Sequence, residues 1–288
     1  IKTCQAPGTL LSDQFVATDS KLNIIHTVAL AGPVQGVTNY GIGGGVYSSG
    51  TISMKFLHIS NNIGGAGAGC FANQLTKDAT VGPFISIHGN DGAYYDDERL
   101  GVGGGMFIGG GVFATDAAVE EFITLNNIHV YMNGMDLSTA EDNRYRGLRI
   151  GGGIVVAGTT KVHMLGVRVE NNVAQSGGGI AVLNGASVTI KDNSILRKNV
   201  AELVDSSSIS SICQEDFDTN EKKYDTCGCG GGGMYVAGEK ASVVVKHSEI
   251  SRSMAKNGGG GGVKMCRSTS GFFDTVVFEG NRAGIPGT

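Results

Sequence analysis

The residues best suited to hydrolytic chemistry are the consecutive acids Asp96-Asp97-Glu98, which follow the tyrosine pair Tyr94-Tyr95. Glycosidases need two carboxyl groups that converge across roughly 5 to 10 Å on the bond to be broken. Adjacent residues of a strand point to opposite faces, so Asp96 and Asp97 do not converge by themselves. The tyrosines either bind a sugar or pack their own loop down. We expect a solvated loop here, with carbohydrate cleavage as the alternative.

A second polar segment, Asp216-Phe217-Asp218-Thr219-Asn220, matches the first three ligand positions of a calcium loop. The match then fails, because Glu221 stands where a glycine should allow the turn and Cys227 where a bidentate glutamate should close the shell. Since Cys213 and Cys229 lie nearby, a disulfide-tied loop is an independent interpretation. We assign no metal ligand to this segment.

The six cysteines are Cys4, Cys70, Cys213, Cys227, Cys229 and Cys266. An even number fits disulfides and an oxidising compartment, although the spacing selects none of the many connectivities. Cys227-Gly228-Cys229 would be half of a metal knot, but no second Cys or His pair lies at zinc-finger spacing. We therefore predict disulfides.

The six histidines are scattered singly, at His26, His58, His88, His129, His163 and His247. No Ser-His-Asp set stands out, and wall or corner positions are expected for the histidines in or beside β-rich runs. Gly109-Gly110-Gly111 lacks the strand-to-helix context and the lysine of a phosphate loop. We predict no catalytic, cofactor-binding or metal-ligating residue, and a protein that is not an enzyme.

The elements that would position these residues are short repeated units, and the stretch from 151 to 199 states one unit twice. Gly151-Gly152-Gly153 leads into Ile154-Val155-Val156, and 26 residues later Gly177-Gly178-Gly179 leads into Ile180-Ala181-Val182. Two further β-rich runs and an asparagine follow in both copies. Self-similarity at a fixed period is the signature of a repeat architecture.

Glycine clusters open the successive units, and most units end with an apolar residue three positions before an asparagine. The clusters lie at 43–45, 64–69, 103–105, 151–153, 177–179, 230–233 and 258–262. The endings are Ile59 to Asn62, Val130 to Asn133, Val169 to Asn172 and Phe278 to Asn281, with one extra residue between Ile195 and Asn199, and with Met254 in this place after Gly233. These repeats predict units that stack.

Runs inside a unit, such as Ser187-Val188-Thr189-Ile190-Lys191, alternate apolar with polar or small residues, which is strand periodicity. Three short strands per unit, turning the same way each time, predict an all-β fold: a single right-handed parallel β-helix of about 7–9 coils. Successive coils lie ~4.8 Å apart, so equivalent residues meet. The expected interior column is Ile154, Ile180, Met234 and Val263, and the expected amide ladder is Asn62, Asn172 and Asn281.

The units divide the chain into two parts. Residues 1–40 are irregular and predict an N-terminal cap with the first strand or strands, because a first coil would otherwise expose its apolar end. Residues 41–288 form the repeated body, with polar insertions at about 73–100, 134–149 and 202–229. Function is then expected at the insertions and at the ends of the stack.

Composition limits the class of protein. Glycine supplies 48 of 288 residues, well above the usual ~7%, without the every-third spacing of collagen. The net charge is −4, so no basic face for nucleic acid is expected. No apolar run approaches the ~18 to 20 residues that span a bilayer. The first residues lack a signal-peptide pattern, as in a mature chain or an excised fragment.

The glycine boxes at 151–154 and 177–180, together with Phe278-Glu279-Gly280-Asn281, resemble the two short repeats of the chlamydial polymorphic membrane protein family over about residues 41–284. Passenger domains of that family are surface adhesins, so the resemblance implies a secreted or surface-displayed β-helix. We expect a non-enzymatic extracellular protein that acts in adhesion or as a building block of a filament, fibre or surface layer. The alternative is a carbohydrate-active β-helix, either a polysaccharide lyase or a glycoside hydrolase. Expected partners are further copies, other surface proteins or a glycan.

Overall fold

The computed structural model describes the chain in segments, and every regular element in them is a β-strand. The described residues are 14–17, 23–25, 33–34, 37–38, 46–48, 51–62, 69–73, 80–90, 101–102, 105–109, 122–134, 149–202, 229–256 and 258–284. No helix occurs in these segments, and the strands pair in parallel except for the small hairpin of β3 (Pro33–Val34) and β4 (Val37–Thr38). The predicted all-β class is confirmed.

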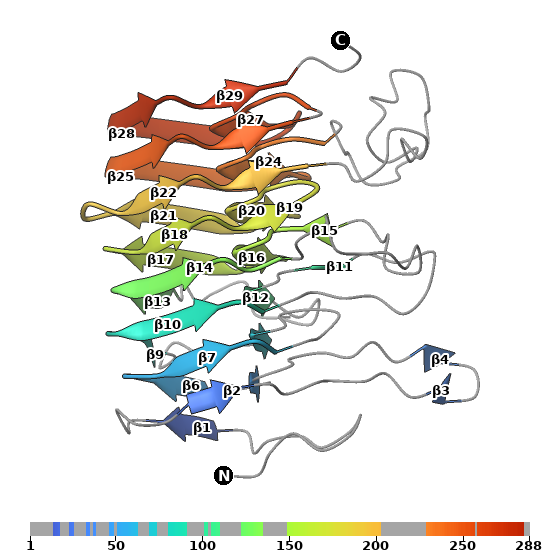
Figure 1. Ribbon diagram of the computed structural model, residues 1–288, viewed down its shortest axis with the longest axis vertical. Helices are drawn as coiled ribbons and strands as arrows, with labels where there is room; N and C mark the ends of the chain where they lie inside the picture. Colours follow the sequence, from blue (N-terminus) through green and yellow to red (C-terminus); the bar gives the residue numbers. More distant parts are fainter. Residues whose placement is uncertain are drawn as a thin grey trace.

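The other strands form ladders, in which strands of successive repeats lie one above another (Figure 1). The first ladder contains β1 (Gln14–Ala17), β6 (Thr51–Met54), β9 (Thr80–Val81), β13 (Phe122–Asn126), β17 (Lys161–Leu165), β21 (Ser187–Lys191) and the N-terminal halves of β25 (Ser242–Ser251) and β28 (Ser270–Glu279). The second contains β2 (Asn23–Ile25), β7 (His58–Ser60), β10 (Ile85–His88), β14 (Ile128–Tyr131), β18 (Arg168–Glu170), β22 (Ile195–Arg197) and the C-terminal halves of β25 and β28.

Two further ladders complete each repeat. The third contains β5 (Val46–Ser48), β8 (Cys70–Asn73), β12 (Met106–Gly109), β16 (Ile154–Ala157), β20 (Ile180–Leu183), β24 (Met234–Ala237) and β27 (Val263–Met265). The short fourth ladder contains β19 (Val173–Ala174), β23 (Val200–Ala201), β26 (Met254–Ala255) and β29 (Arg282–Ala283). Beside them β11 (Gly101–Val102) pairs with β15 (Arg149–Ile150).

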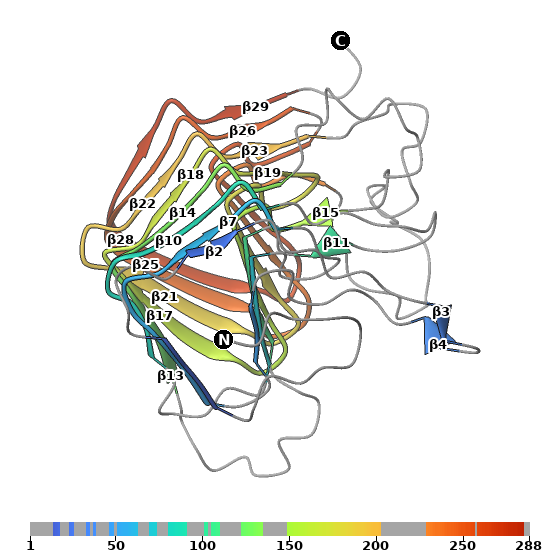
Figure 2. The ribbon, with the colours of Figure 1, turned by 60° about the horizontal axis from the view of Figure 1, so that its bottom comes forward.

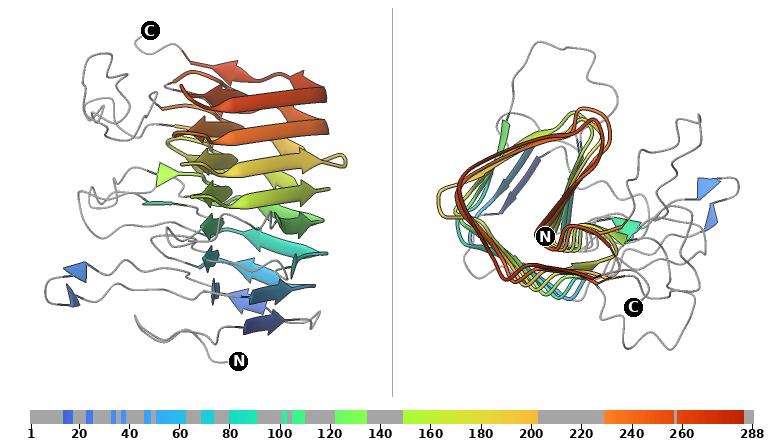
Figure 3. Two further views of the ribbon diagram at one scale, coloured as in Figure 1. Left: turned by 180° about the vertical axis from the view of Figure 1, so that it is seen from behind. Right: turned by 90° about the horizontal axis from the view of Figure 1, so that it is seen from above.

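The ladders share one interior. The first and second ladders form a single 14-stranded sheet, because the ten-residue strand β25 passes round the bend and pairs in both. Strands of successive repeats overlie one another and surround a common interior, as seen along the stacking direction in the right-hand view of Figure 3 and obliquely in Figure 2. Between Ile154 and Ala283 the chain visits the third, first, second and fourth ladders four times in that order.

Interior side chains meet their counterparts in the neighbouring repeats. Ile154, Ile180, Met234 and Val263 are in register as predicted, and Val46, Cys70 and Met106 extend this column. Strands of the first ladder alternate buried with partly exposed residues, as in β17 and β21. The strand periodicity of the sequence is therefore the alternation between this interior and the outer surface.

The amide ladder is longer than the sequence indicated. It runs through Asn62, Asn90, Asn133, Asn172, Asn199, Ser253 and Asn281. In the central part, each Oδ1 accepts from the backbone N–H and from the Nδ2 of the preceding asparagine, for example at 3.0 Å from both nitrogens of Asn133 to Asn172. Each Nδ2 also donates to a backbone carbonyl, as Asn172 does to Val130 at 3.0 Å. The buried amides are thereby satisfied.

Two endings of the repeat differ from the prediction. Leu196, not Ile195, is in register with the interior residue Val169, so the spacing before Asn199 is the regular three residues. In the following repeat Ser253, not Met254, occupies the asparagine position, three residues after buried Ile250. Because Ile195 and Leu196 are both apolar, apolarity alone does not tell which of them faces inward.

Glycine is needed beside the amide ladder because there is no room for a Cβ atom. A Cβ on Gly179 would lie 2.5 Å from the Gly233 carbonyl oxygen and 2.8 Å from Asn199 Nδ2. The same conflict with a carbonyl and an asparagine recurs at Gly69, Gly105 and Gly153. The glycine clusters and the asparagines of the sequence therefore contact each other in the fold, and the glycines leave the room that the asparagine side chains need.

From β7 onward, each second-ladder strand is bounded by two corner residues in the left-handed conformation. The first corner lies three residues before the interior residue of the strand, and its φ values are between 46° and 61°. It is occupied by Phe56, Phe84, Asn127, Gly166, Asn193, His247 and Thr275. The second corner holds Asn61, Gly89, Met132, Asn171, Lys198, Arg252 and Gly280, with φ between 51° and 62°. This conformation costs an ordinary L-residue roughly 1–2 kcal/mol, which Gly avoids and Asn and Asp tolerate best.

The segment 73–100 was predicted to be an insertion, but part of it is a regular repeat. It contains β9 and β10, which pair in the first and second ladders, and Asn90 of the amide ladder. Its polar flanks hid a regular repeat. Strands β1 and β2 of the predicted cap likewise pair in these ladders, whereas most of 134–149 and 202–229 lies outside the described residues.

Replacing Ser253 with asparagine is expected to stabilise the protein. The Ser253 hydroxyl accepts the Asn199 backbone N–H at 3.3 Å, but Asn199 Nδ2 donates only to the Val169 carbonyl. An asparagine would restore the missing bond, so Ser253→Asn should raise the free energy of unfolding by about 1 kcal/mol in urea titrations followed by circular dichroism. A loss of stability would contradict this account of the ladder.

Candidate functional site

Several residues singled out in the sequence lie outside the described segments. These are Tyr94, Tyr95, Asp96, Asp97 and Glu98, the segment 216–220, and the residues His26, Cys4, Cys213 and Cys227. The interpretations offered for them stay predictions. The other histidines and three cysteines can be placed.

The cysteines are not all paired. Cys70 is a free thiol buried in the interior column between Val46 and Met106, and burial raises its pKa to about 12. In this position it packs as a small apolar side chain. Cys229 and Cys266 are disulfide-bonded. With Cys70 free, the six cysteines do not form three disulfides within the chain, which corrects that part of the expectation.

Histidines that are far apart in the sequence come together on the outer side of the second ladder. His58, His88 and His129 lie on β7, β10 and β14, and Tyr131 is in register with His88. The His88 and Tyr131 rings stack with centroids 4.7 Å apart, the Tyr131 and His129 rings at 4.2 Å, and His58 meets His88 edge-on at 5.1 Å. The expectation that the histidines are single and separate is wrong for these three.

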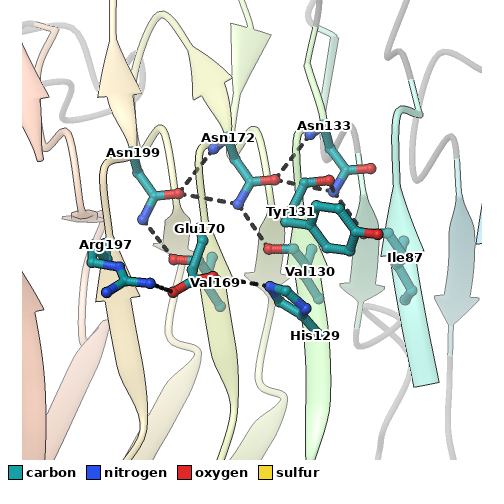
Figure 4. Close-up of polar contacts among 10 residues, drawn as sticks. All are labelled: Ile87, His129, Val130, Tyr131, Asn133, Val169, Glu170, Asn172, Arg197 and Asn199. Carbon is teal, nitrogen blue, oxygen red and sulfur yellow. Dashed lines mark hydrogen bonds and ion pairs between the residues drawn. The ribbon is translucent and has the colours of Figure 1, made fainter. Parts of the chain in front are cut away.

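A buried glutamate continues this row into the next repeats (Figure 4). Glu170 on β18 is almost completely buried, and its two carboxylate oxygens have different partners. His129 Nε2 lies 3.1 Å from Oε2, and Arg197 Nη2 donates to Oε1 at 2.7 Å. The carboxylate is thus held between an imidazole and a guanidinium, which is how proteins stabilise a buried charge.

The surroundings of His88 favour its neutral form. Burial and the neighbouring His58 and His129 lower the pKa of His88 below its ordinary value. The imidazole of His88 is therefore uncharged at neutral pH, and it loses its neutrality only at a lower pH than an ordinary histidine. Hydrogen bonding and ring stacking are what this row offers to a partner.

The row has few features of a catalytic centre. Both oxygens of Glu170 are engaged, and in the segments that are described no three His, Cys, Asp or Glu side chains come together as metal ligands. His129 has the one arrangement known from catalytic sites, because a buried carboxylate orients its imidazole as it would orient a general base. The register of the repeats would have been the signal for the cluster, since His58, His88, His129 and Tyr131 all flank the interior residues of consecutive second-ladder strands.

Comparison with known proteins gives no relative for this chain. No family model matches it, and neither the curated proteins nor the solved structures include a significant match. Among the described residues there is no helix with the length and apolar character required to span a membrane.

Proposed function

We propose that the chain is a single right-handed parallel β-helix that serves, outside the cell, as a non-enzymatic building block of a filament, fibre or surface layer. The support for the solenoid is the fourfold recurrence of the same ladder order with constant register. Right-handed winding is the hand of nearly all parallel crossovers. The resemblance to the repeats of chlamydial polymorphic membrane proteins supports display on a surface, where adhesion to other proteins or a glycan is a role of the same class.

The observation that supports assembly is that the strands at both ends of the ladders have one unpaired edge. Within the described residues, β1, β2 and β5 pair on one side only, and so do β27, β28 and β29 at the other end. All of these edge strands pair in parallel with their neighbours, so they run in the same direction as the rest of their ladders. The last strand of one copy can therefore pair with the first strand of the next without reversal, and such a head-to-tail contact builds a filament when it does not close.

The C-terminal end also exposes side chains that belong to the interior. Phe278 is in register with the buried Ile250, yet it is 51% exposed, and Phe273 and Val276 are only partly buried. Within the described residues no further layer covers these apolar groups, and exposed apolar groups of this kind are typical of a contact surface. A second copy would present the first, second and third ladders to them, beginning with β1, β2 and β5.

The test is electron microscopy and sedimentation of the purified chain at increasing concentration. We expect filaments or short head-to-tail oligomers, and expect Phe278→Lys to abolish them because it places a charge in the end contact. Val277→Lys is the matched control, since Val277 is 55% exposed on the same strand but is in register with the outward residue Glu249. A wild-type chain that stays monomeric at high concentration would contradict the proposal.

Carbohydrate cleavage is the second candidate, and the orientation of His129 by Glu170 is the observation in its favour. Release of reducing ends or unsaturated uronates from acidic or neutral polysaccharides, lost in Asp96→Asn, Asp97→Asn or His129→Gln, would establish it in place of the structural role.

A further inference from the structure

The second ladder changes character along its length. In β7, β10 and β14 the positions on either side of the interior residue hold only His, Ser and Tyr. In the following repeats the same positions hold Arg168, Glu170, Arg197, Glu249 and Glu279, among others. Charged residues are depleted and aromatic residues enriched in the cores of protein interfaces. The strands β7, β10 and β14 therefore share the lack of charge of an interface core, whereas the later strands have the charged residues of a solvated surface.

Large apolar side chains stand at the corners of the same three repeats. Phe56, Phe84 and Met132 are 41%, 68% and 62% exposed, and all three adopt left-handed φ values of 53° to 61°. The equivalent corners of the later repeats hold Gly, Asn, Lys, Arg, His or Thr. Exposure and backbone strain both oppose a phenylalanine or methionine here, and strained residues of this kind cluster at functional sites.

The rings are arranged for contact through their edges. Phe56 and Phe84 stack with centroids 5.5 Å apart and an interplanar angle of 20°, and the His88, Tyr131 and His129 rings stack at 19° and 27°. Each of these five rings therefore has at least one face against a neighbour, and Tyr131 stacks with both His88 and His129, so ring edges make up much of what this row presents. Ring edges suit aromatic and apolar side chains of a protein, whereas a sugar-binding platform needs a free ring face.

From this pattern we propose that the uncharged face, formed by Phe56, Phe84, His88, His129, Tyr131 and Met132, is a lateral contact with a second copy of this chain. A face without Lys, Arg, Asp or Glu in its strands can meet the same face of a second copy, because this contact brings no like charges together even though each chain carries a net charge of −4.

The size of the face indicates how it works. Three strands ~4.8 Å apart and about six residues from corner to corner give an area on the order of 300 Å², below the ~800 Å² per partner of a stable dimer. One such contact is weak, but contacts repeated along two neighbouring filaments add through effective concentration. The inference rests on the proposed filament for the strength of the lateral contact, whereas the location of the contact on the second ladder does not depend on it.

Photocrosslinking locates the contact. We expect Phe84→p-benzoylphenylalanine, in a mixture of isotopically light and heavy chains, to give intermolecular crosslinks to the uncharged face of the other copy. The same probe at Phe278 reports the head-to-tail contact separately, so loss of one contact does not mask the other. Crosslinks from position 84 that land on β27–β29, or no intermolecular crosslinks from position 84, would overturn the lateral contact.

A second pair of variants separates contact from folding. Phe56→Asn combined with Phe84→Asn relieves the corner strain, so thermal stability should be kept or raised while lateral association weakens about tenfold or more. His247→Asn is the control, because His247 occupies the same corner with φ 46° in the charged part of the ladder. Association of the double variant at the wild-type level, measured by sedimentation velocity, would contradict the proposal.

Discussion

Replacing Gly179 with alanine is expected to lower the free energy of unfolding by about 3 kcal/mol, a large share of the ~5–15 kcal/mol that stabilises a typical domain. The added Cβ would lie 2.5 Å from the Gly233 carbonyl oxygen and 2.8 Å from Asn199 Nδ2. Neither atom can move freely, because Gly233 is part of the next repeat and the Asn199 amide bonds to the Val169 carbonyl at 2.8 Å. The measurement is urea unfolding followed by far-ultraviolet circular dichroism.

Gly259→Ala is the matched control for this substitution. Gly259 is exposed and lies in another glycine cluster, and a Cβ there would have only the Lys264 side chain as a neighbour, at 3.8 Å or more. Its stability should stay within about 0.5 kcal/mol of the wild type. Equal effects at both positions would mean that the close approach between repeats does not explain the glycine column.

Asn172→Ala is expected to cost about 3 kcal/mol, the second large effect. Asn172 Oδ1 accepts from the backbone nitrogen and from Nδ2 of Asn133, both at 3.0 Å, and its own Nδ2 donates to Asn199 Oδ1 and the Val130 carbonyl. Alanine removes all of these bonds and leaves the buried Asn133 N–H without an acceptor. Thermal and urea unfolding measure the loss.

The neighbouring residue provides the control, because Asn171→Gly changes an asparagine one position away without touching the ladder. Asn171 is exposed, with φ 54°, and glycine stands at the same corner in Gly89 and Gly280. We expect a change of no more than about 0.5 kcal/mol. A loss at Asn171 comparable to that at Asn172 would attribute the effect to the turn instead of the amide ladder.

The parts of the fold that follow from one repeat could be predicted from the sequence. The interior column of Ile154, Ile180, Met234 and Val263 and the role of the asparagines were read from spacing, because both depend on residue type at a fixed period. Asn90 was missed because two features hide its repeat in the sequence. The repeat has long polar flanks, and its first strand, β9, has only two residues. The register at Leu196 was missed because Ile195 beside it is equally apolar.

The candidate surface could be predicted only through the exact register of the repeats. Packing fixes the residue type only on the inner side of a strand, so the outward positions that carry His58, His88, His129 and Tyr131 have no pattern of their own. Their contacts arise between repeats, and a one-residue error in register would separate them. The left-handed corners of Phe56, Phe84 and Met132 carry no signal in the sequence either, since these residues are not the usual occupants of that conformation.

The directional pattern of the asparagine contacts bears on how such a molecule can change length. In the central rungs, each asparagine accepts two hydrogen bonds from the preceding asparagine and donates two to the following one, and each glycine fits against the asparagine that follows it. Duplicating or deleting 151–176 as a block would keep the glycines and asparagines of neighbouring repeats in register, although a deletion would remove Glu170 from between His129 and Arg197. Growth by whole modules is therefore the route of variation that this architecture tolerates best.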